Sequence, residues 1–125
     1  MSPRDDRGSA IVDFVLVGAL VTLVFAGVVQ LTLVLHVRNT LVDAAAEGAR
    51  YAAPGRTDDD AVERASTLVE GSLAPSFAQD VSARRTRLGG LDVVEVEIRA
   101  PLPLVGLLGP SGVMTVRGHA LAEGP

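Results

Sequence analysis

Few side chains in this sequence are placed to catalyse a reaction. His36 and His119 lie far apart in the chain, and neither has a His, Cys or acidic neighbour at the spacing of metal ligands. Ser72 and Ser111 lack the flanking residues of a nucleophile elbow. The chain contains no cysteine, so no zinc-thiolate site or thiol nucleophile can form. We therefore predict that the protein is not an enzyme and that it needs no metal ion or other cofactor.

One carboxylate has an unusual position, at the edge of a long apolar segment. Asp13 follows Gly8 by five residues and directly precedes Phe14. An ionised carboxylate at the edge of a bilayer costs less free energy than one at its centre, yet it still favours a polar partner. On the residues alone, Asp13 either pairs with a cation or extends to the cytoplasmic interface.

The segment after Asp13 is long enough to span a membrane. Residues 14–35 contain no charged side chain. As a helix they would measure about 33 Å, against a hydrocarbon core of about 30 Å. A secretory signal has an apolar core of only about 7–15 residues, so we expect the segment to remain as an anchor. Arg4 and Arg7 in the short head favour a cytoplasmic N-terminus, although Arg38 on the far side weakens this bias.

Small and polar residues recur every four positions within this span, at Gly18, Thr22, Ala26 and Gln30. Such residues lie along one helix face, where small side chains permit close approach of a second helix and Gln30 can bond across the interface. The alternative is that glycine and threonine are simply common in membrane helices. The face is a candidate surface for helix packing.

The start of the span resembles the processing site of type IV pilins, in which a membrane aspartyl peptidase cuts after the glycine. Residues 43–53 resemble the small-residue segment that follows the membrane helix in TadE-like proteins, the minor pseudopilins of the Tad or Flp pilus apparatus. The resemblance covers about the first 53 residues. It implies cleavage between Gly8 and Ser9 by a prepilin peptidase, and pairing of Asp13 with the freed Ser9 amine in the same chain or a neighbour. The acid is Asp13 where pilins mostly have Glu, so its reach is shorter.

The resemblance implies a minor pseudopilin-like membrane protein that assists assembly or anchoring of a Tad/Flp-type pilus for adhesion or secretion. Its expected partners are the membrane, the prepilin peptidase, other pilin or pseudopilin subunits and Tad-type assembly proteins. Nucleic acid is not expected, because the net charge is −4 and the basic residues are dispersed. Two alternatives remain: an uncleaved single-pass membrane-tethered module that binds an extracytoplasmic ligand, and a subunit of another envelope complex.

We predict an α+β fold in three parts: a cytoplasmic leader at 1–8, a helix at 9–53 that contains the span, and a small extracytoplasmic domain at 54–125. No proline interrupts residues 9–53, and Pro54-Gly55 ends the helix. The exported part of this helix has an alanine-rich side, which needs a close-packed neighbour in its own domain or in another subunit. Thr57 is a good N-cap for a second helix at about 58–73.

The remainder predicts a small antiparallel sheet. Gly89-Gly90 separates two alternating segments, 81–88 and 94–100, as in a β-hairpin, and Arg and Glu side chains would face each other across it. Residues 114–120 are a candidate third strand. The apolar stretch 102–110 has too many Gly and Pro residues for a second span, and either covers the core or contacts a membrane or partner.

Overall fold

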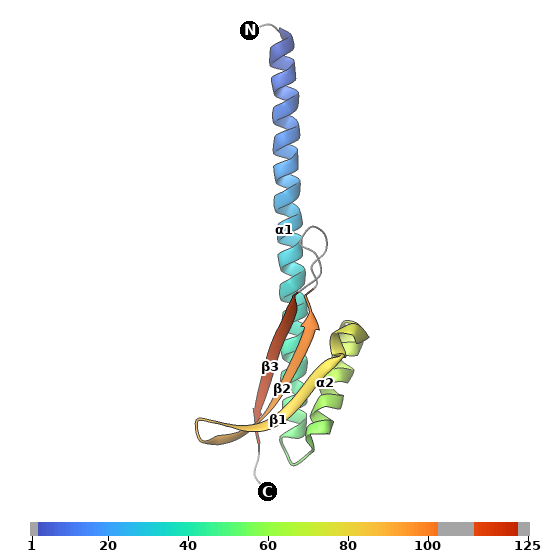
Figure 1. The fold of residues 1–125 in the computed structure, drawn as a ribbon, viewed down its shortest axis with the longest axis vertical. Helices are drawn as coiled ribbons and strands as arrows, with labels where there is room; N and C mark the ends of the chain where they lie inside the picture. The colour runs from blue at the N-terminus through green and yellow to red at the C-terminus, as the bar shows by residue number, and fades with distance from the viewer. Residues whose placement is uncertain (1–2, 103–111, 123–125) are drawn as a thin grey trace. The chain divides into compact units, whose positions relative to one another are not determined.

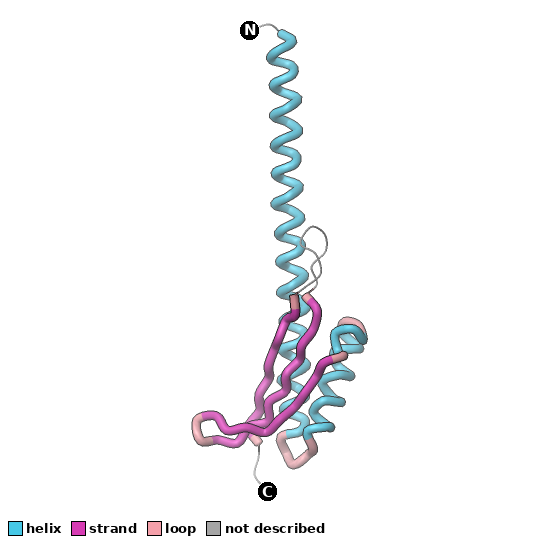
Figure 2. Tube along the Cα trace, in the orientation of Figure 1, coloured by secondary structure: helices cyan, strands magenta, loops and turns pink. Residues whose placement is uncertain are grey.

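The computed structural model describes residues 3–102 and 112–122, and shows two α-helices, a 3₁₀ turn and a three-stranded sheet (Figures 1 and 2). The elements in chain order are α1 (Pro3–Ala52), α2 (Asp58–Ser72), η1 (Pro75–Ala78), β1 (Asp80–Leu88), β2 (Leu91–Pro101) and β3 (Val113–Leu121). This is the α+β fold expected from the sequence, with a long N-terminal apolar helix, a second helix and an antiparallel sheet. Helix α1 begins six residues earlier than expected, inside the predicted leader.

Contacts divide the chain into two units, Met1–Leu33 and Val34–Pro125. The first unit consists of the N-terminal part of α1. Its apolar window has a mean hydropathy of 2.5 with no residue buried inside the protein. Exposure of an apolar helix of this length to water is unfavourable. Transfer of the same helix into hydrocarbon is favourable, because its backbone groups are already hydrogen-bonded within the helix. The first unit therefore fits a membrane anchor.

In the second unit, the C-terminal part of α1 packs against α2 and one face of the sheet. The largest fully buried side chains are Leu41 of α1, Val69 of α2, and Val94, Val96 and Ile98 of β2. The alanines of α1 complete this core: Ala44, Ala45, Ala49 and Ala52 are all buried. The chain's own downstream domain is thus the neighbour that covers the alanine-rich side.

Two glycines permit the close packing on α1. A Cβ on Gly48 would lie 2.8 Å from the backbone oxygen of Ala61 and 2.9 Å from Ala65 Cβ, so α2 approaches α1 closely there. A Cβ on Gly118 of β3 would overlap the backbone of α1 at Ala45 and Ala46. Gly48 of α1 therefore permits the close helix–helix spacing, and Gly118 of β3 permits the close helix–strand spacing.

The sheet has the order β1-β2-β3 with both pairs antiparallel. Gly89 and Gly90 have φ angles of 59° and 82°, and two consecutive positive φ values are what a two-residue type I′ hairpin turn needs. The predicted hairpin is confirmed, with Arg84 opposite Glu95. The third strand is also confirmed and extends one residue further at each end than predicted.

The connection from α1 to α2 is held by side chains as well as by packing. The Thr57 hydroxyl accepts from the Asp60 N–H at 3.2 Å, and Asp60 Oδ2 accepts from the Thr57 N–H at 3.0 Å, which confirms Thr57 as the N-cap and completes a capping box. Arg85 of β1 donates to the backbone oxygens of Ala52 and Arg56. A guanidinium at the end of α1 also stabilises the helix dipole.

The predicted apolar stretch 102–110 lies outside the described residues except for Leu102. The Leu102 side chain packs against the core, and its N–H donates to the Gly112 oxygen at 3.0 Å. Leu102 itself therefore covers the core.

Candidate functional site

The four residues of the predicted processing and assembly site lie in the first turns of α1. Gly8, Ser9, Asp13 and Phe14 are all exposed, and Phe14 has 80% of its surface accessible. A Cβ on Gly8 would meet no atom within 4 Å. Ser9 and Asp13 are four residues apart in a helix and so lie on the same side, one turn from each other. The helix thus leaves the residue on each side of the predicted cut, and the acid, exposed.

The predicted packing surface also lies on the exposed part of α1. Gly18, Thr22 and Ala26 are exposed, and Gln30 is half-buried. A Cβ on Gly18 would meet no atom within 4 Å. The structure therefore leaves Gly18, Thr22 and Ala26 exposed at helical spacing, and their role in helix packing stays a prediction.

A buried carboxylate on the other face of the sheet was not singled out by the sequence. Val94, Val96 and Ile98 of β2 point toward the helices, so Glu95, between them, points to the outer face of the sheet. Glu95 is nevertheless only 5% exposed. Side chains from both neighbouring strands cover it, and three of them place nitrogen atoms within 4 Å of the carboxylate.

These side chains are Arg84 of β1 and Arg117 and His119 of β3. Arg84 Nη2 lies 3.0 Å from Glu95 Oε1, His119 Nε2 lies 2.9 Å from Oε2, and Arg117 Nε lies 3.7 Å from Oε1. Burial raises the pKa of Glu95, but the hydrogen bond from His119 and the charge and hydrogen bond of Arg84 outweigh burial and bring the pKa below its ordinary value. The carboxylate is therefore ionised and links the three strands.

We expect Glu95→Gln to lower the free energy of unfolding of the second unit by about 1–2 kcal/mol at pH 7, because charged hydrogen bonds are replaced by weaker neutral ones. The folded-state pKa lies below the unfolded value, so this stabilisation is present above the unfolded pKa and is lost as the pH falls through the folded pKa. Thermal unfolding of the full chain in detergent, from pH 7 down to pH 3, measures the difference.

Asp92→Asn is the control for this prediction, since Asp92 pairs with Arg87 while 67% of its side chain is exposed. An exposed pair contributes little, so the control should change stability by less than about 0.5 kcal/mol. A Glu95→Gln difference that stays constant down to pH 3 would contradict the assigned role of the carboxylate.

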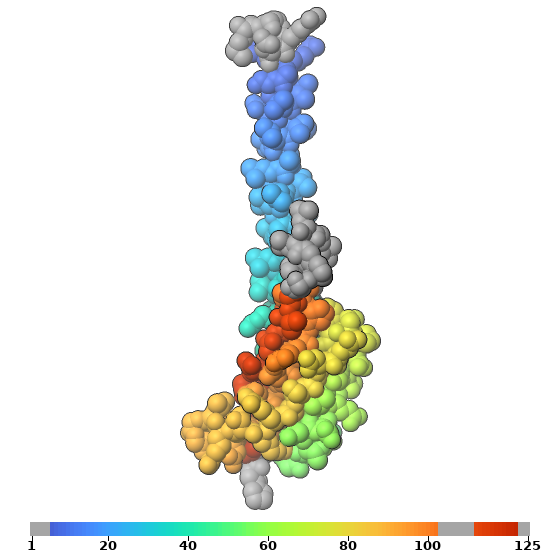
Figure 3. All heavy atoms as spheres, in the orientation of Figure 1, coloured from blue at the N-terminus to red at the C-terminus, as the bar shows by residue number. Residues whose placement is uncertain are grey.

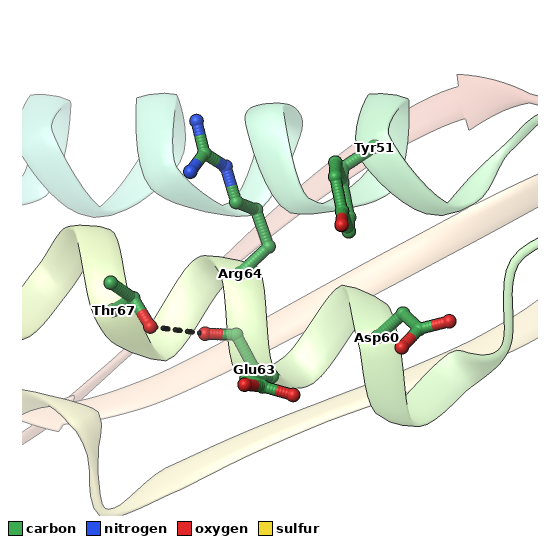
Figure 4. A pocket seen from close by; sticks show the side chains of 5 residues that line it. All are labelled: Tyr51, Asp60, Glu63, Arg64 and Thr67. Atoms are coloured by element: carbon green, nitrogen blue, oxygen red, sulfur yellow. Dashed lines mark hydrogen bonds between the residues drawn. The ribbon is translucent and has the colours of Figure 1, made fainter.

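One hollow on the second unit has polar side chains that are already engaged in contacts within the chain. A hollow of about 220 Å³ lies between α1 and α2, lined by Tyr51, Asp60, Glu63, Arg64 and Thr67 (Figure 4). The Thr67 hydroxyl is already bonded to the Glu63 backbone oxygen, and the Arg56 guanidinium stacks 4.2 Å from the Tyr51 ring centre. No group of three or more His, Cys, Asp or Glu side chains in the described ranges could hold a metal ion.

The sequence also missed Gly118 and Arg85, which position the sheet and the end of α1. A glycine inside an alternating strand signals close approach of another backbone, so Gly118 carried a detectable signal. Nothing local distinguished Arg85 from Arg84 or Arg87, because its role depends on where α1 ends in space.

A family model described as TadE-like protein matches residues 8–50, which is the N-terminal part of the chain from the glycine of the predicted cut to near the end of α1. No curated protein and no solved structure matches the chain. TadE-like proteins are associated with the Tad pilus and the membrane, and the family is not known as enzymatic. Residues 8–50 are therefore similar to TadE-like proteins, in agreement with the resemblance recognised in the sequence.

Proposed function

We propose that this protein is a minor pseudopilin-like membrane protein that assists assembly or anchoring of a Tad/Flp-type pilus for adhesion or secretion. The observation that carries the proposal is the register of Gly8, Asp13 and Phe14 at the start of an exposed apolar helix, inside the TadE-like match. A processing peptidase in the membrane needs an accessible cut site beside a span, and the exposed first turns of α1 supply both.

The protein would act by association rather than by catalysis. The first unit would lie in the cytoplasmic membrane, where Gly18, Thr22, Ala26 and Gln30 offer a surface to the helices of other pilin or pseudopilin subunits. The second unit has its own core, and it would contact Tad-type assembly proteins outside the cytoplasm. Prepilin peptidase would act before assembly, on the leader at 1–8.

The test of the proposal is whether residues 1–8 are removed in cells that contain the cognate prepilin peptidase. We expect wild-type protein to begin at Ser9, and Gly8→Val to remain full length because the larger side chain crowds the cleavage subsite. Since a Cβ at Gly8 meets no atom within 4 Å, the substitution should not disturb the fold. Intact mass of the membrane-extracted protein measures the cut.

Gly18→Val is the matched control. Gly18 is also an exposed glycine of α1, and a Cβ added to it would meet no atom within 4 Å. This variant should be cut as the wild type is. Wild-type protein that stays full length beside an active peptidase would refute the processing step. It would favour the uncleaved membrane-tethered binding module instead.

We further expect an N-terminus inside the cytoplasm and the second unit outside, from Arg4 and Arg7 in the short head. The absence of cysteine from the chain allows a clean measurement. In the uncut Gly8→Val background, a membrane-impermeant maleimide should label Gly71→Cys, on the exposed side of α2, in intact spheroplasts. It should label Ser2→Cys only after the membrane is ruptured, and the reverse pattern would reverse the topology.

A further inference from the structure

Strand β3 is the terminal strand of the sheet, and its hydrogen-bond pattern shows which backbone groups point away from β2. At its two ends, the Leu102 N–H donates to the Gly112 oxygen and the Ala122 N–H donates to the Asp92 oxygen. Along an antiparallel strand, every second residue directs its N–H and C=O groups to the neighbouring strand. The even-numbered residues from 112 to 122 therefore form the backbone hydrogen bonds with β2. The odd-numbered residues therefore direct their N–H and C=O groups to the free edge.

The free edge thus presents the backbone groups of five residues, Val113, Thr115, Arg117, His119 and Leu121. Their side chains also share one side, since the even-numbered Met114, Val116 and Gly118 are buried against the helices and these five are exposed. Figure 3 shows β3 atoms, in red, at the surface of the second unit. Among residues 3–102 and 112–122, no strand other than β2 pairs with β3.

Natural proteins protect the edges of sheets with charges, prolines, bulges or a covering helix. The opposite terminal strand, β1, has this protection, since it carries three arginines and an aspartate. Strand β3 has nine residues without proline or lysine, an uninterrupted register with β2, and Arg117 as its one permanently charged residue. It therefore retains the features of a strand that accepts another strand.

We propose that the β3 edge binds an extended segment of a partner polypeptide by strand addition, and that this segment has an acidic side chain at its centre and apolar side chains at its ends. Strand addition uses the five outward N–H and C=O pairs for affinity and the side chains for selection. The exposed Val113 and Leu121, at 69% and 58%, would contact the apolar ends.

The positive charge of Arg117 favours an acidic residue at the centre of the bound segment, and it disfavours a second copy of this chain as the partner. Arg117 is 53% exposed, and its contacts with Glu95 and Glu97, at 3.7 and 3.4 Å, leave the guanidinium accessible to a third carboxylate. Antiparallel pairing of two β3 strands about their centre would place Arg117 opposite Arg117, and like charges directly opposite each other are destabilising. The site goes beyond the proposed function, since it does not depend on cleavage at Gly8.

The experiment is residue-resolved amide hydrogen exchange on the full-length chain in detergent micelles. The probe is a nine-residue synthetic peptide with valine at both ends, glutamate at its fifth position and threonine elsewhere; the control peptide has lysine in place of the glutamate. With the glutamate peptide, the amides of Thr115, Arg117 and His119 should exchange at least about tenfold more slowly. The even-numbered amides of β3 should be protected with or without peptide, and the lysine peptide should have a much smaller effect.

Thr115→Pro and Thr115→Val are the matched variants. Proline removes an N–H that points to the free edge and leaves the pairing with β2 intact, so it should abolish the peptide effect while the even-numbered amides stay protected. Valine keeps the N–H and should keep the effect. The same results are expected in the Gly8→Val background, which separates this site from the processing step.

Three outcomes would overturn the proposal. Odd-numbered amides that are protected at every concentration without peptide would mean that the chain covers its own edge. Protection that grows with protein concentration would identify a second copy as the occupant. No effect of either peptide, or equal effects of both, would rule out an acidic strand.

Discussion

Replacing Gly118 by alanine is expected to lower the free energy of unfolding of the second unit by about 3 kcal/mol or more, and its melting temperature by at least about 10 °C. The added Cβ would lie 2.5 Å from the Ala45 carbonyl carbon and 2.6 Å from Ala46 Cα. Both are backbone atoms of α1, so no side-chain rotation relieves the overlap. Strand β3 must separate from α1, which exposes the core between them.

Alanine substitutions at two other glycines provide a scale against which the loss of stability at Gly118 can be compared. Gly48→Ala should cost less, about 1–3 kcal/mol, because one of its two closest contacts is the Cβ of Ala65 and α2 can shift slightly. Gly71→Ala, at an exposed site of α2 with no atom within 4 Å, should be neutral or stabilise by about 0.5 kcal/mol.

Thermal unfolding of the full chain in detergent can be followed by the near-ultraviolet signal of Tyr51, which is the single tyrosine in a chain without tryptophan. Tyr51 lies at the α1–α2 hollow (Figure 4) and therefore reports on the second unit rather than on the anchor. Equal melting temperatures for the Gly118 and Gly71 variants would show that β3 does not approach α1 as closely as described.

The features predicted from the sequence are those whose physical cause is local. The Thr57 cap needs only a side chain three residues before Asp60, and the hairpin needs only two glycines between alternating strands. The anchor is equally local, because a helix satisfies its own backbone and the apolar run fixes its length.

The features that were missed depend on contacts between distant parts of the chain. Glu95 alternates with buried valines, and the sequence predicted only that arginine and glutamate side chains face each other across the hairpin; the structure adds a third strand, so that three side chains from two strands surround the carboxylate. Its burial follows from the register of β3, which the sequence suggested only as a strand. Similarly, the alanine-rich side of α1 predicted a close neighbour but left open whether that neighbour was in the same chain.

The second large effect is expected at Asp13, in assembly rather than in cleavage. Asp13 is exposed on α1, on the same side as Ser9 and one turn from it. If the carboxylate pairs with the freed Ser9 amine of a neighbouring subunit, Asp13→Asn removes the charge at nearly constant volume, and Asp13→Ala also removes the hydrogen bond. A charged hydrogen bond contributes about 1.5–3 kcal/mol, so association should weaken about tenfold or more.

Both variants should still be inserted and cut, since Gly8 and the span are unchanged, and both should lose crosslinking to pilin or pseudopilin subunits in the membrane. Asp13→Glu is the matched control and should retain most of the crosslinking, because the charge survives. Intact mass establishes processing in each sample before crosslinking is compared. Asn and Ala variants that crosslink as well as wild type would leave Asp13 as a residue that only reaches the cytoplasmic interface, and the anchor would then associate through its small-residue face alone.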